Sequence, residues 1–491
     1  MGYPFAVEFS AFVSEVKQIP VKSVCKVKEN PGQSKHLETA KTSVLDTELD
    51  FVNLRDERYA EDSRIPTQVT FGTPLQDALR RDITINSLFY NVHSRSVEDH
   101  CGKGLDDLRN GFIRTPLPPR QTFLDDPLRV VRCIRFASRF GFKLVSELEE
   151  SARDPEMQAA ITQKITRERV GEEIDKMMIG RDPYRSIQLI DSLSLSSTVF
   201  HIPPAISSTL SHPPTSSASA VAAAAILQTF LRPDIALFPH PPLHPLLLSV
   251  APSSRSITAR LYLACALTPY RGSTYVDHRG REHLAVEAAI REGLKIGTKH
   301  HYLDGIPLLY TAAELLKQPK MDDERFKTPS ERVAIGLLLR NTAVHNPLID
   351  SHWTVSLLFA LVQDLVPLYD VVNDTFDVER AKDTIQTYNA FVSRIEELGL
   401  DKAVDAKPIL DGHEVVTILE AAKPGQWTGK ILNRVVEWQL EHPQGTKDDC
   451  AEWLQAEKAA GRLVLEDAHP ASRVKRGKNG DKPEGTKKSK R

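Results

Sequence analysis

A row of arginines between Leu124 and Phe142 is the segment best suited to chemistry. It reads LDDPLRVVRCIRFASRFGF, and on a helix at 100° per residue the arginines fall within an arc of about 120°, opposite the apolar residues. Guanidinium groups donate forked hydrogen bonds that match phosphate oxygens. The row consists of Arg129, Arg132, Arg135 and Arg139. It predicts a phosphate-binding helix face.

Two acids stand at the start of this helix. Asp126 can cap it, with Pro127 in the first turn. From Arg109 to Lys143 there are eight basic residues and only two acids, Asp125 and Asp126, so we expect these carboxylates to work with the arginines. The alternative is a solvated arginine face on an amphipathic helix, although such a face usually mixes Lys, Glu and Gln with arginine.

A second cluster lies in ALRRDITINSLFYN. Arg81 and Asp82, with Asn86 one turn later, place donors and an acceptor close together. The alternative is a helix C-terminus whose charges complement its dipole. Further on, GKGLDDLRNG forms a polar, glycine-punctuated loop that leads into the strand-like FIRT.

The elements that must position these residues change character along the chain. Residues 36–55 predict a β-hairpin around a turn at 45–47, residues 68–71 a short strand, and residues 74–80 a helix that opens with proline. Beyond Thr122 helical spacing dominates; for example, Ile385, Tyr388, Val392 and Ile395 precede a stop at Gly399. Residues 201–256 are rich in Pro, Ser and Ala, and their centre can form one alanine-rich helix.

Composition limits the class of protein. The 491 residues are 41% hydrophobic and 26% charged, and no run approaches the roughly 20 apolar residues of a membrane helix, so no membrane partner is expected. The net charge is −2, with nine Lys/Arg and two acids in residues 471–491. The five cysteines show neither disulfide nor zinc spacing. We expect a cytoplasmic or nuclear protein, with a mitochondrial isoform possible from an upstream start.

The order of these motifs resembles a known family. RRDxxxN, then D…GxxDL, then DDPLRxxRxxRFxxRF, then ITRERVGEEIDKMM is similar to the class II tRNA nucleotidyltransferases, which are CCA-adding enzymes, and to the bacterial poly(A) polymerases that share their head and neck. The segments KHLETA and ELDFVNLR look most like fungal members, and PILDGHEV with GKILNRVVEWQLEHP resembles the family's C-terminal part.

The resemblance implies an α+β fold with five parts. These are a partial nucleotidyltransferase head of mixed β-sheet and helices over 1–120, a helical neck with the nucleotide-reading motif over 121–200, a linker or insertion over 201–256, a helical tRNA-binding body and tail over 257–470, and a disordered basic tail over 471–491.

The resemblance also implies roles for individual residues. Asp125, Asp126 and Arg129 match the motif that reads the Watson–Crick edge of the incoming nucleotide. Arg81, Arg132 and Arg135 would hold the triphosphate, and Asp82 and Asn86 the sugar and the local loop. Arg167, Glu168 and Arg169 match the neck motif that orients the reading pair; alternatively, they are surface charges of a helix.

Members of the family also carry a GGxxRD loop and a DxD strand that binds Mg²⁺. Neither occurs in these 491 residues, which suggests a truncated gene model, an internal start or a genuine loss. Glu48 and Asp50, at i and i+2, share one face of a strand, and we predict Asp50 as a metal ligand with Glu48 beside it. The alternative is a surface pair on an edge strand.

The implied function is addition of CCA to tRNA 3′ ends from CTP and ATP, with Mg²⁺ as cofactor and tRNA as partner. Activity of the chain as written is in doubt because the main metal ligands are missing. The alternatives are a poly(A) polymerase of the same superfamily and a non-catalytic RNA- or nucleotide-binding remnant. The oligomeric state is not predictable from these residues.

Overall fold

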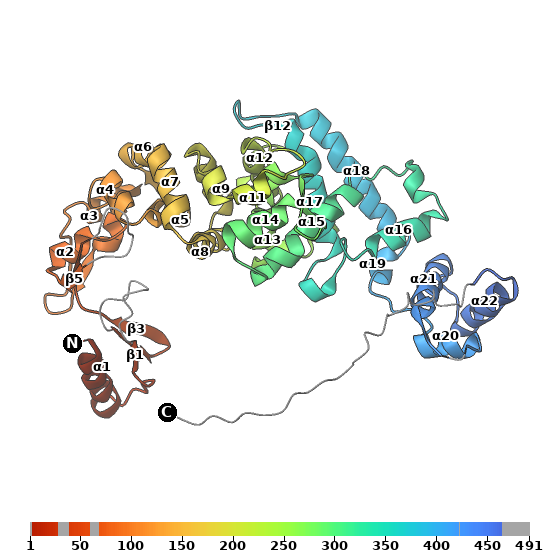
Figure 1. The fold of residues 1–491 in the computed structure, drawn as a ribbon, viewed down its shortest axis with the longest axis horizontal. Coiled ribbons are helices and arrows are strands. Elements are labelled where there is room, and N and C mark those ends of the chain that lie inside the picture. The colour runs from red at the N-terminus through yellow and green to blue at the C-terminus, as the bar shows by residue number, and fades with distance from the viewer. Residues whose placement is uncertain (1, 28–38, 59–67, 422, 464–491) are drawn as a thin grey trace, which may run out of the picture. The chain divides into compact units, whose positions relative to one another are not determined.

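The computed structural model of this chain describes residues 2–27, 39–58, 68–421 and 423–463. The chain divides into two compact units (Figure 1). The first comprises Met1–Met321 and Asn341–Arg394, and the second Asp322–Arg340 and Ile395–Arg491. The tail at 471–491, expected to be disordered, lies outside the described residues. The architecture is α+β, as predicted, with small sheets near the N-terminus followed by helices.

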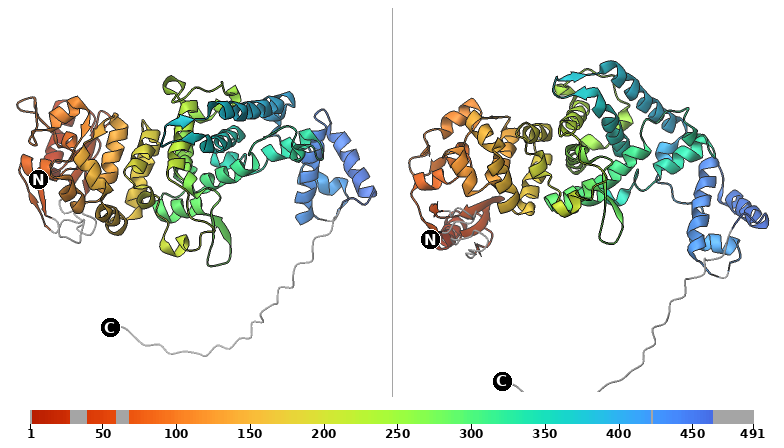
Figure 2. Two further views of the ribbon diagram at one scale, coloured as in Figure 1. Left: turned by 90° about the horizontal axis from the view of Figure 1, so that it is seen from above. Right: turned by 45° about the horizontal axis from the view of Figure 1, so that its top comes forward.

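The first unit begins with a helix beside a three-stranded antiparallel sheet of order β1-β2-β3. In Figure 2 the helix and the hairpin, in dark red, lie next to each other. The rings of Phe5 and Phe9 contact that of Phe51. The predicted hairpin is confirmed from residue 39 onward, with its turn at Leu45 and Asp46. The elements are α1 (Gly2–Ala11), the π-helix η1 (Phe12–Val16), β1 (Cys25–Val27), β2 (Thr39–Val44) and β3 (Thr47–Phe51).

Short hairpins and helices complete the segment before the arginine row. The predicted strand and proline-started helix are confirmed as β5 and α2, and Thr73 and Gln76 form a capping box at the start of α2. The elements are β4 (Arg55–Arg58), β5 (Gln68–Phe71), α2 (Pro74–Leu79), the 3₁₀ turn η3 (Thr84–Ser87), β6 (Phe89–Asn91), β7 (Ser96–Glu98), α3 (Gly104–Asn110), β8 (Phe112–Ile113) and α4 (Pro119–Asp125).

The arginine row lies on α5, Leu128–Phe140, as predicted. The N-cap is Pro127 rather than Asp126, although the Asp126 carboxylate accepts the N–H of Leu128 at 3.3 Å. Helix α5 packs against α8 and α9. The next elements are β9 (Lys143–Leu144), α6 (Ser146–Arg153), α7 (Pro155–Lys164), α8 (Arg167–Met178), α9 (Pro183–Ser192), α10 (Ser196–Val199) and α11 (Pro204–Ser207).

The alanine-rich segment forms α12, Ala218–Leu231, as predicted. Eleven of its 14 residues are buried, and it packs against α9, α13 and α17. This part of 201–256 is therefore packed into the core of the first unit. Around it are α13 (Arg255–Ala266), β10 (Thr274–Val276), β11 (Glu282–Leu284), α14 (Ala285–Ala288), the π-helix η8 (Ala289–Leu294), α15 (Tyr302–Leu315), α17 (Trp353–Leu365), β12 (Tyr369–Asp370), β13 (Thr375–Phe376) and α18 (Val378–Glu397).

Helix α18 confirms the periodicity read from its sequence, because all four predicted apolar positions are fully buried and Gly399 follows with a φ of 60°. The second unit has its own apolar core, which includes Trp427, Val435, Cys450 and Leu454. Its other helices are α16 (Glu331–Leu339), α19 (Leu400–Ala403), α20 (Gly412–Ile418), α21 (Gln426–Glu441) and α22 (Lys447–Ala459). No helix in the described residues is long and apolar enough to cross a membrane.

Gly171 tests how closely α8 is packed. A Cβ at this position would lie 2.0 Å from the carbonyl oxygen of Leu294, and backbone cannot move aside as a side-chain end can. We expect Gly171→Ala to lower the free energy of unfolding by about 1–3 kcal/mol. Calorimetric unfolding measures this. The control is Gly429→Ala, in α21, where a Cβ meets nothing within 4 Å; it should be neutral or stabilising by up to about 1 kcal/mol. Equal effects would contradict the packing argument.

Candidate functional site

Asp82 is the centre of one cluster of predicted residues. Its side chain is 8% exposed and accepts hydrogen bonds from the N–H of Ile83 at 2.9 Å, Nδ2 of Asn86 at 3.0 Å and Nε of Arg132 at 2.8 Å. Burial alone would raise the pKa of Asp82, but the charge of Arg132 and these hydrogen bonds hold it below its ordinary value. The fold thus brings Arg132 to Asp82 and Asn86, although Arg132 lies 50 residues after Asp82 in the sequence.

Glu173 neutralises the next turn of the arginine row. It lies on α8, is 3% exposed, and pairs with Nε of Arg135 at 2.5 Å and Nζ of Lys176 at 2.9 Å. Nη1 of Arg132 is 3.8 Å away. Asp125 and Asp126 are the only acids near the row in sequence, but Asp82 and Glu173 reach it from elements distant in sequence. The sequence analysis does not predict Glu173 as a site residue. The one sequence feature that could have indicated it is its position in the motif GEEIDKMM.

Arg129 is buried and does not belong to an exposed face. It is 7% exposed, and it donates to the carbonyl oxygen of Thr122 at 3.2 Å and to that of Arg80 at 2.6 Å. The arginine row is therefore neither a uniform phosphate-binding face nor a solvated one. Arg129 fastens the start of α5 to the end of α2.

Asp126 is held by helix α8. Its carboxylate pairs with Nη2 of Arg169 at 2.9 Å, and the two side chains are 19% and 32% exposed. Both therefore remain accessible to a ligand. Within the described residues the carboxylate of Asp125 has no hydrogen-bonded or ion-paired partner, and burial raises its pKa while the charge of Arg129 opposes that shift.

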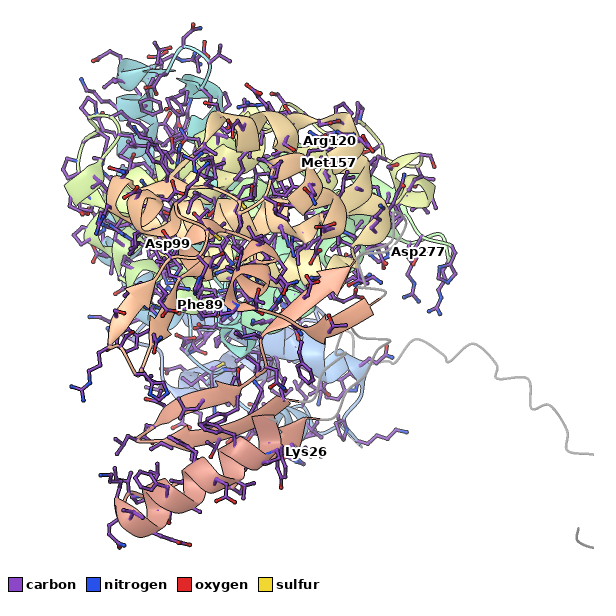
Figure 3. All side chains as sticks on the ribbon, turned by 90° about the vertical axis from the view of Figure 1, so that its left-hand side faces the viewer. Lys26, Phe89, Asp99, Arg120, Met157 and Asp277 are labelled. Atoms are coloured by element: carbon purple, nitrogen blue, oxygen red, sulfur yellow. The ribbon has the colours of Figure 1, made fainter. Side chains whose placement is uncertain are left out.

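Arg81 is oriented by a carboxylate that the sequence did not single out. Its Nη2 donates to Asp77 at 2.8 Å, and its Nη1 to the carbonyl oxygen of Asn86 at 2.6 Å. The guanidinium carbon lies 4.9 Å from the ring centre of Phe89, which is labelled in Figure 3. Asp77 is 1% exposed and also holds Arg80. Arg81 remains 34% exposed and can still meet a ligand.

The other two neck-motif residues lie apart from Asp126. Arg167 donates to the carbonyl oxygens of Thr198, Val199 and Gly293, and burial lowers its pKa to about 10. Glu168 is more than half exposed and pairs with Lys295 at 3.3 Å. Of the three, only Arg169 contacts the predicted reading motif.

The carboxylates predicted as metal ligands do not fit a Mg²⁺ site. Asp50 pairs with Lys41 at 3.0 Å, and both side chains are more than half exposed. Glu48 is likewise exposed on β3, an edge strand of its sheet. No group of three or more His, Cys, Asp or Glu side chains in the described ranges could hold a metal ion. This geometry is that of a surface pair on an edge strand.

The chain is similar to known proteins of one family. The Poly A polymerase head domain matches residues 5–114. The mitochondrial CCA tRNA nucleotidyltransferase of Saccharomyces cerevisiae is 35% identical, over 88% of this chain and 78% of its own length. This chain belongs to the class II CCA-adding tRNA nucleotidyltransferase family.

Further comparisons agree with that assignment. The corresponding Candida glabrata protein is 34% identical, over 88% of this chain and 80% of its own length. An apo CCA-adding enzyme structure shares the fold with a TM-score of 0.52 at 15% identity, over 92% of this chain and 85% of that one. The family resemblance of the motifs is thus confirmed. In the first unit of this chain, Asp82 pairs with Arg132 on α5 and Asp126 pairs with Arg169 on α8. The two helices pack against each other.

Asp82→Asn tests the ion pair with Arg132. At pH 7 we expect the free energy of unfolding to fall by about 1–3 kcal/mol, because a partly buried guanidinium loses its carboxylate. The lowered pKa of Asp82 makes this stabilisation complete above the unfolded value of about 3.9, and it disappears as the pH falls through the folded value. Urea unfolding of the variant and the wild type between pH 7 and about pH 2.5 follows the difference.

The matched control is Asp50→Asn. Its carboxylate is 58% exposed and paired with an equally exposed lysine, so removing the charge should change stability by less than about 0.5 kcal/mol. Indistinguishable losses from Asp50→Asn and Asp82→Asn would show that burial of the Asp82 pair has no energetic consequence.

Proposed function

We propose that this protein adds CCA to tRNA 3′ ends from CTP and ATP, with its own side chains selecting the base. The observation that carries the proposal is the 35% identity, over 88% of the chain, to a protein named CCA tRNA nucleotidyltransferase. Solved structures of similar fold include a CCA-adding enzyme in complex with ATP, at a TM-score of 0.52. The two relatives compared above are named mitochondrial, and we extend the proposal to a mitochondrial form.

Asp126 is our candidate for reading the base. A carboxylate can accept a hydrogen bond from the exocyclic amine that cytosine and adenine share, whereas uracil and guanine present a carbonyl there. The pair with Arg169 holds the carboxylate in position. Arg129 uses two of its five N–H donors on backbone carbonyls, and we assign it the ring nitrogen beside the amine.

Arg81, Arg132 and Arg135 are our candidates for the triphosphate. Arg81 and Arg132 are each about one-third exposed, so each can offer donors outward while its carboxylate partner fixes its position. Arg135 is only 11% exposed and contributes mainly charge. Asp82 and Asn86, bonded to each other, would support the sugar and the loop.

Transfer of a nucleotide to a 3′-hydroxyl requires carboxylates that clamp Mg²⁺ beside these groups. Asp50 and Glu48 are the remaining candidates in this chain, and their exposure and the Lys41 pair argue against them. This favours a second candidate function: binding of nucleotides and RNA without catalysis by these 491 residues.

Asp126→Asn tests base selection. An amide can donate to the uracil or guanine carbonyl, so the preference for CTP over UTP should fall. One mispaired polar group costs about 1–3 kcal/mol, or roughly 5- to 150-fold in affinity. Calorimetric titration with all four nucleotides measures this. The control, Asp106→Asn, changes a carboxylate that is 73% exposed and should leave the preference intact. Equal wild-type affinity for all four nucleotides would refute protein-templated selection.

The metal-site argument gives a separate prediction for activity. Purified residues 1–491 should add little or no CMP to a tRNA that lacks its CCA end, because loss of the main metal ligands costs far more than the roughly 100-fold of a 1 Å misplacement. A fusion that supplies a GGxxRD loop and a DxD strand should restore incorporation of labelled CMP. Efficient Mg²⁺-dependent addition by residues 1–491 would overturn this, and its loss in Asp50→Ala would then identify Asp50 as a ligand.

A further inference from the structure

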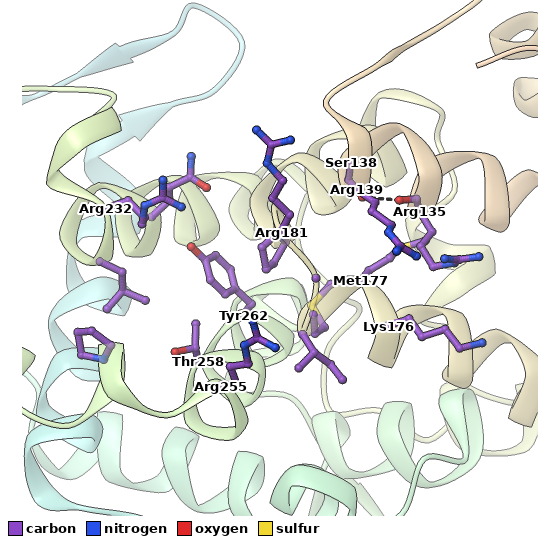
Figure 4. Close-up of a pocket in the computed structure, with 17 residues that line it drawn as sticks. Arg135, Ser138, Arg139, Lys176, Met177, Arg181, Arg232, Arg255, Thr258 and Tyr262 are labelled. Carbon is purple, nitrogen blue, oxygen red and sulfur yellow. Dashed lines mark hydrogen bonds between the residues drawn. The ribbon is translucent and has the colours of Figure 1, made fainter. Parts of the chain in front are cut away.

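A cavity adjoins the candidate site at Arg135. It has a volume of about 920 Å³ and lies between the end of α5, the α8–α9 connection, α12 and α13 of the first unit (Figure 4). That volume is at the upper end of the roughly 300–1,000 Å³ range of small-molecule sites. Six basic side chains line it, and no acidic side chain does. They are Arg135, Arg139, Lys176, Arg181, Arg232 and Arg255.

Half of these cations are paired with neighbouring acids and half are not. Arg135 and Lys176 pair with Glu173, and Arg232 pairs with Asp234 at 2.9 Å. The other three are Arg139, Arg181 and Arg255. They are exposed, and among the described residues none of them has a carboxylate partner. Three unpaired guanidiniums around one cavity repel one another, and a polyanion would offset that repulsion.

The floor of the cavity carries two buried polar side chains. Tyr262 is 3% and Gln228 is 7% exposed, and neither side chain has a hydrogen-bond partner in the part of the chain that the structure describes. The Tyr262 hydroxyl points into the cavity (Figure 4). Burial raises the pKa of this hydroxyl, so it remains a donor. The hydroxyl can therefore donate to a ligand rich in acceptor oxygens.

We propose that this basic pocket is a second phosphate-binding site, separate from the nucleotide site at Asp126, and that it takes a group with two or more phosphates. The phosphates belong either to the backbone of a bound RNA or to a free oligophosphate. Arg132 belongs only to the candidate site, whereas Arg135, a triphosphate candidate as well, also lines the pocket. The two are neighbours on α5 that share Glu173, so an RNA strand could meet both sites. The RNA source rests on the proposed function, whereas the free oligophosphate does not.

The test uses Arg181→Gln/Arg255→Gln in the full chain. Neither side chain has a protein partner to lose among the described residues, so the variant should fold. The control, Arg95→Gln/Arg279→Gln, removes the same charge from exposed positions outside the pocket. One probe is inorganic tripolyphosphate, titrated calorimetrically with CTP at saturation to fill the nucleotide site. The other is a tRNA that lacks CCA, titrated at several salt concentrations.

We expect the pocket variant to lose about ten-fold or more in affinity for at least one probe, since the loss of one charged hydrogen bond alone weakens binding by about that factor. A lost RNA contact should also reduce the salt slope by about 0.7–0.9 per phosphate. Tyr262→Phe, which changes no charge, should weaken the same probe several-fold. A loss for tRNA alone identifies an RNA backbone, a loss for tripolyphosphate alone a free oligophosphate, and a loss for both a site open to either.

Affinities for both probes that match those of the control variant would overturn the proposal. If the wild type still prefers CTP to UTP in that case, only the pocket inference fails. If the wild type shows no base preference and binds no tRNA, the proposed function fails, and the tripolyphosphate titration still decides whether the pocket takes phosphates.

Discussion

The ion pairs that α5 makes with Asp82 and Glu173 are the constraint on which the candidate site depends. Both carboxylates are less than a tenth exposed, and they approach the helix from a turn before it and from α8 after it. A buried charge that loses its partner is strongly destabilising. The arginines can therefore be packed at this junction only when all three elements are in place, and the same contacts hold Arg132 partly open to solvent.

Guanidinium groups also tie the first unit together through backbone carbonyls. Arg129 joins α5 to the end of α2, Arg167 joins α8 to the segments at 198–199 and 293, and Arg260 donates to the carbonyl oxygens of Ile349 and Asp350. Each fork donates to two or more backbone carbonyl oxygens at helix ends or in loops. Arginine acts here as a connector between distant parts of the chain.

Local signals predicted the local structure well. The β2–β3 hairpin, the proline-started α2 and the buried stripe of α18 follow from alternation, capping and periodicity, which involve only near neighbours in sequence. The partners of the arginine row could not be found that way. Glu173 and Asp77 read as ordinary helix acids, and Arg129 reads as one member of an exposed face, because ion pairing and burial depend on which helices meet. A link between Asp126 and Arg169 could be predicted only from the family resemblance that the order of the motifs indicates.

Helix α12 has a simple sequence, but its residues are not free to vary. Its run of alanines looks like filler between prolines, yet three helices pack around it, and small side chains allow that close approach. Each added methylene would have to displace a neighbouring helix, since interiors are packed near the density of crystals. If this segment were removed as low-complexity sequence, part of the core of the first unit would be lost. Residues inserted into α12 would likewise disturb the packing of the helices around it.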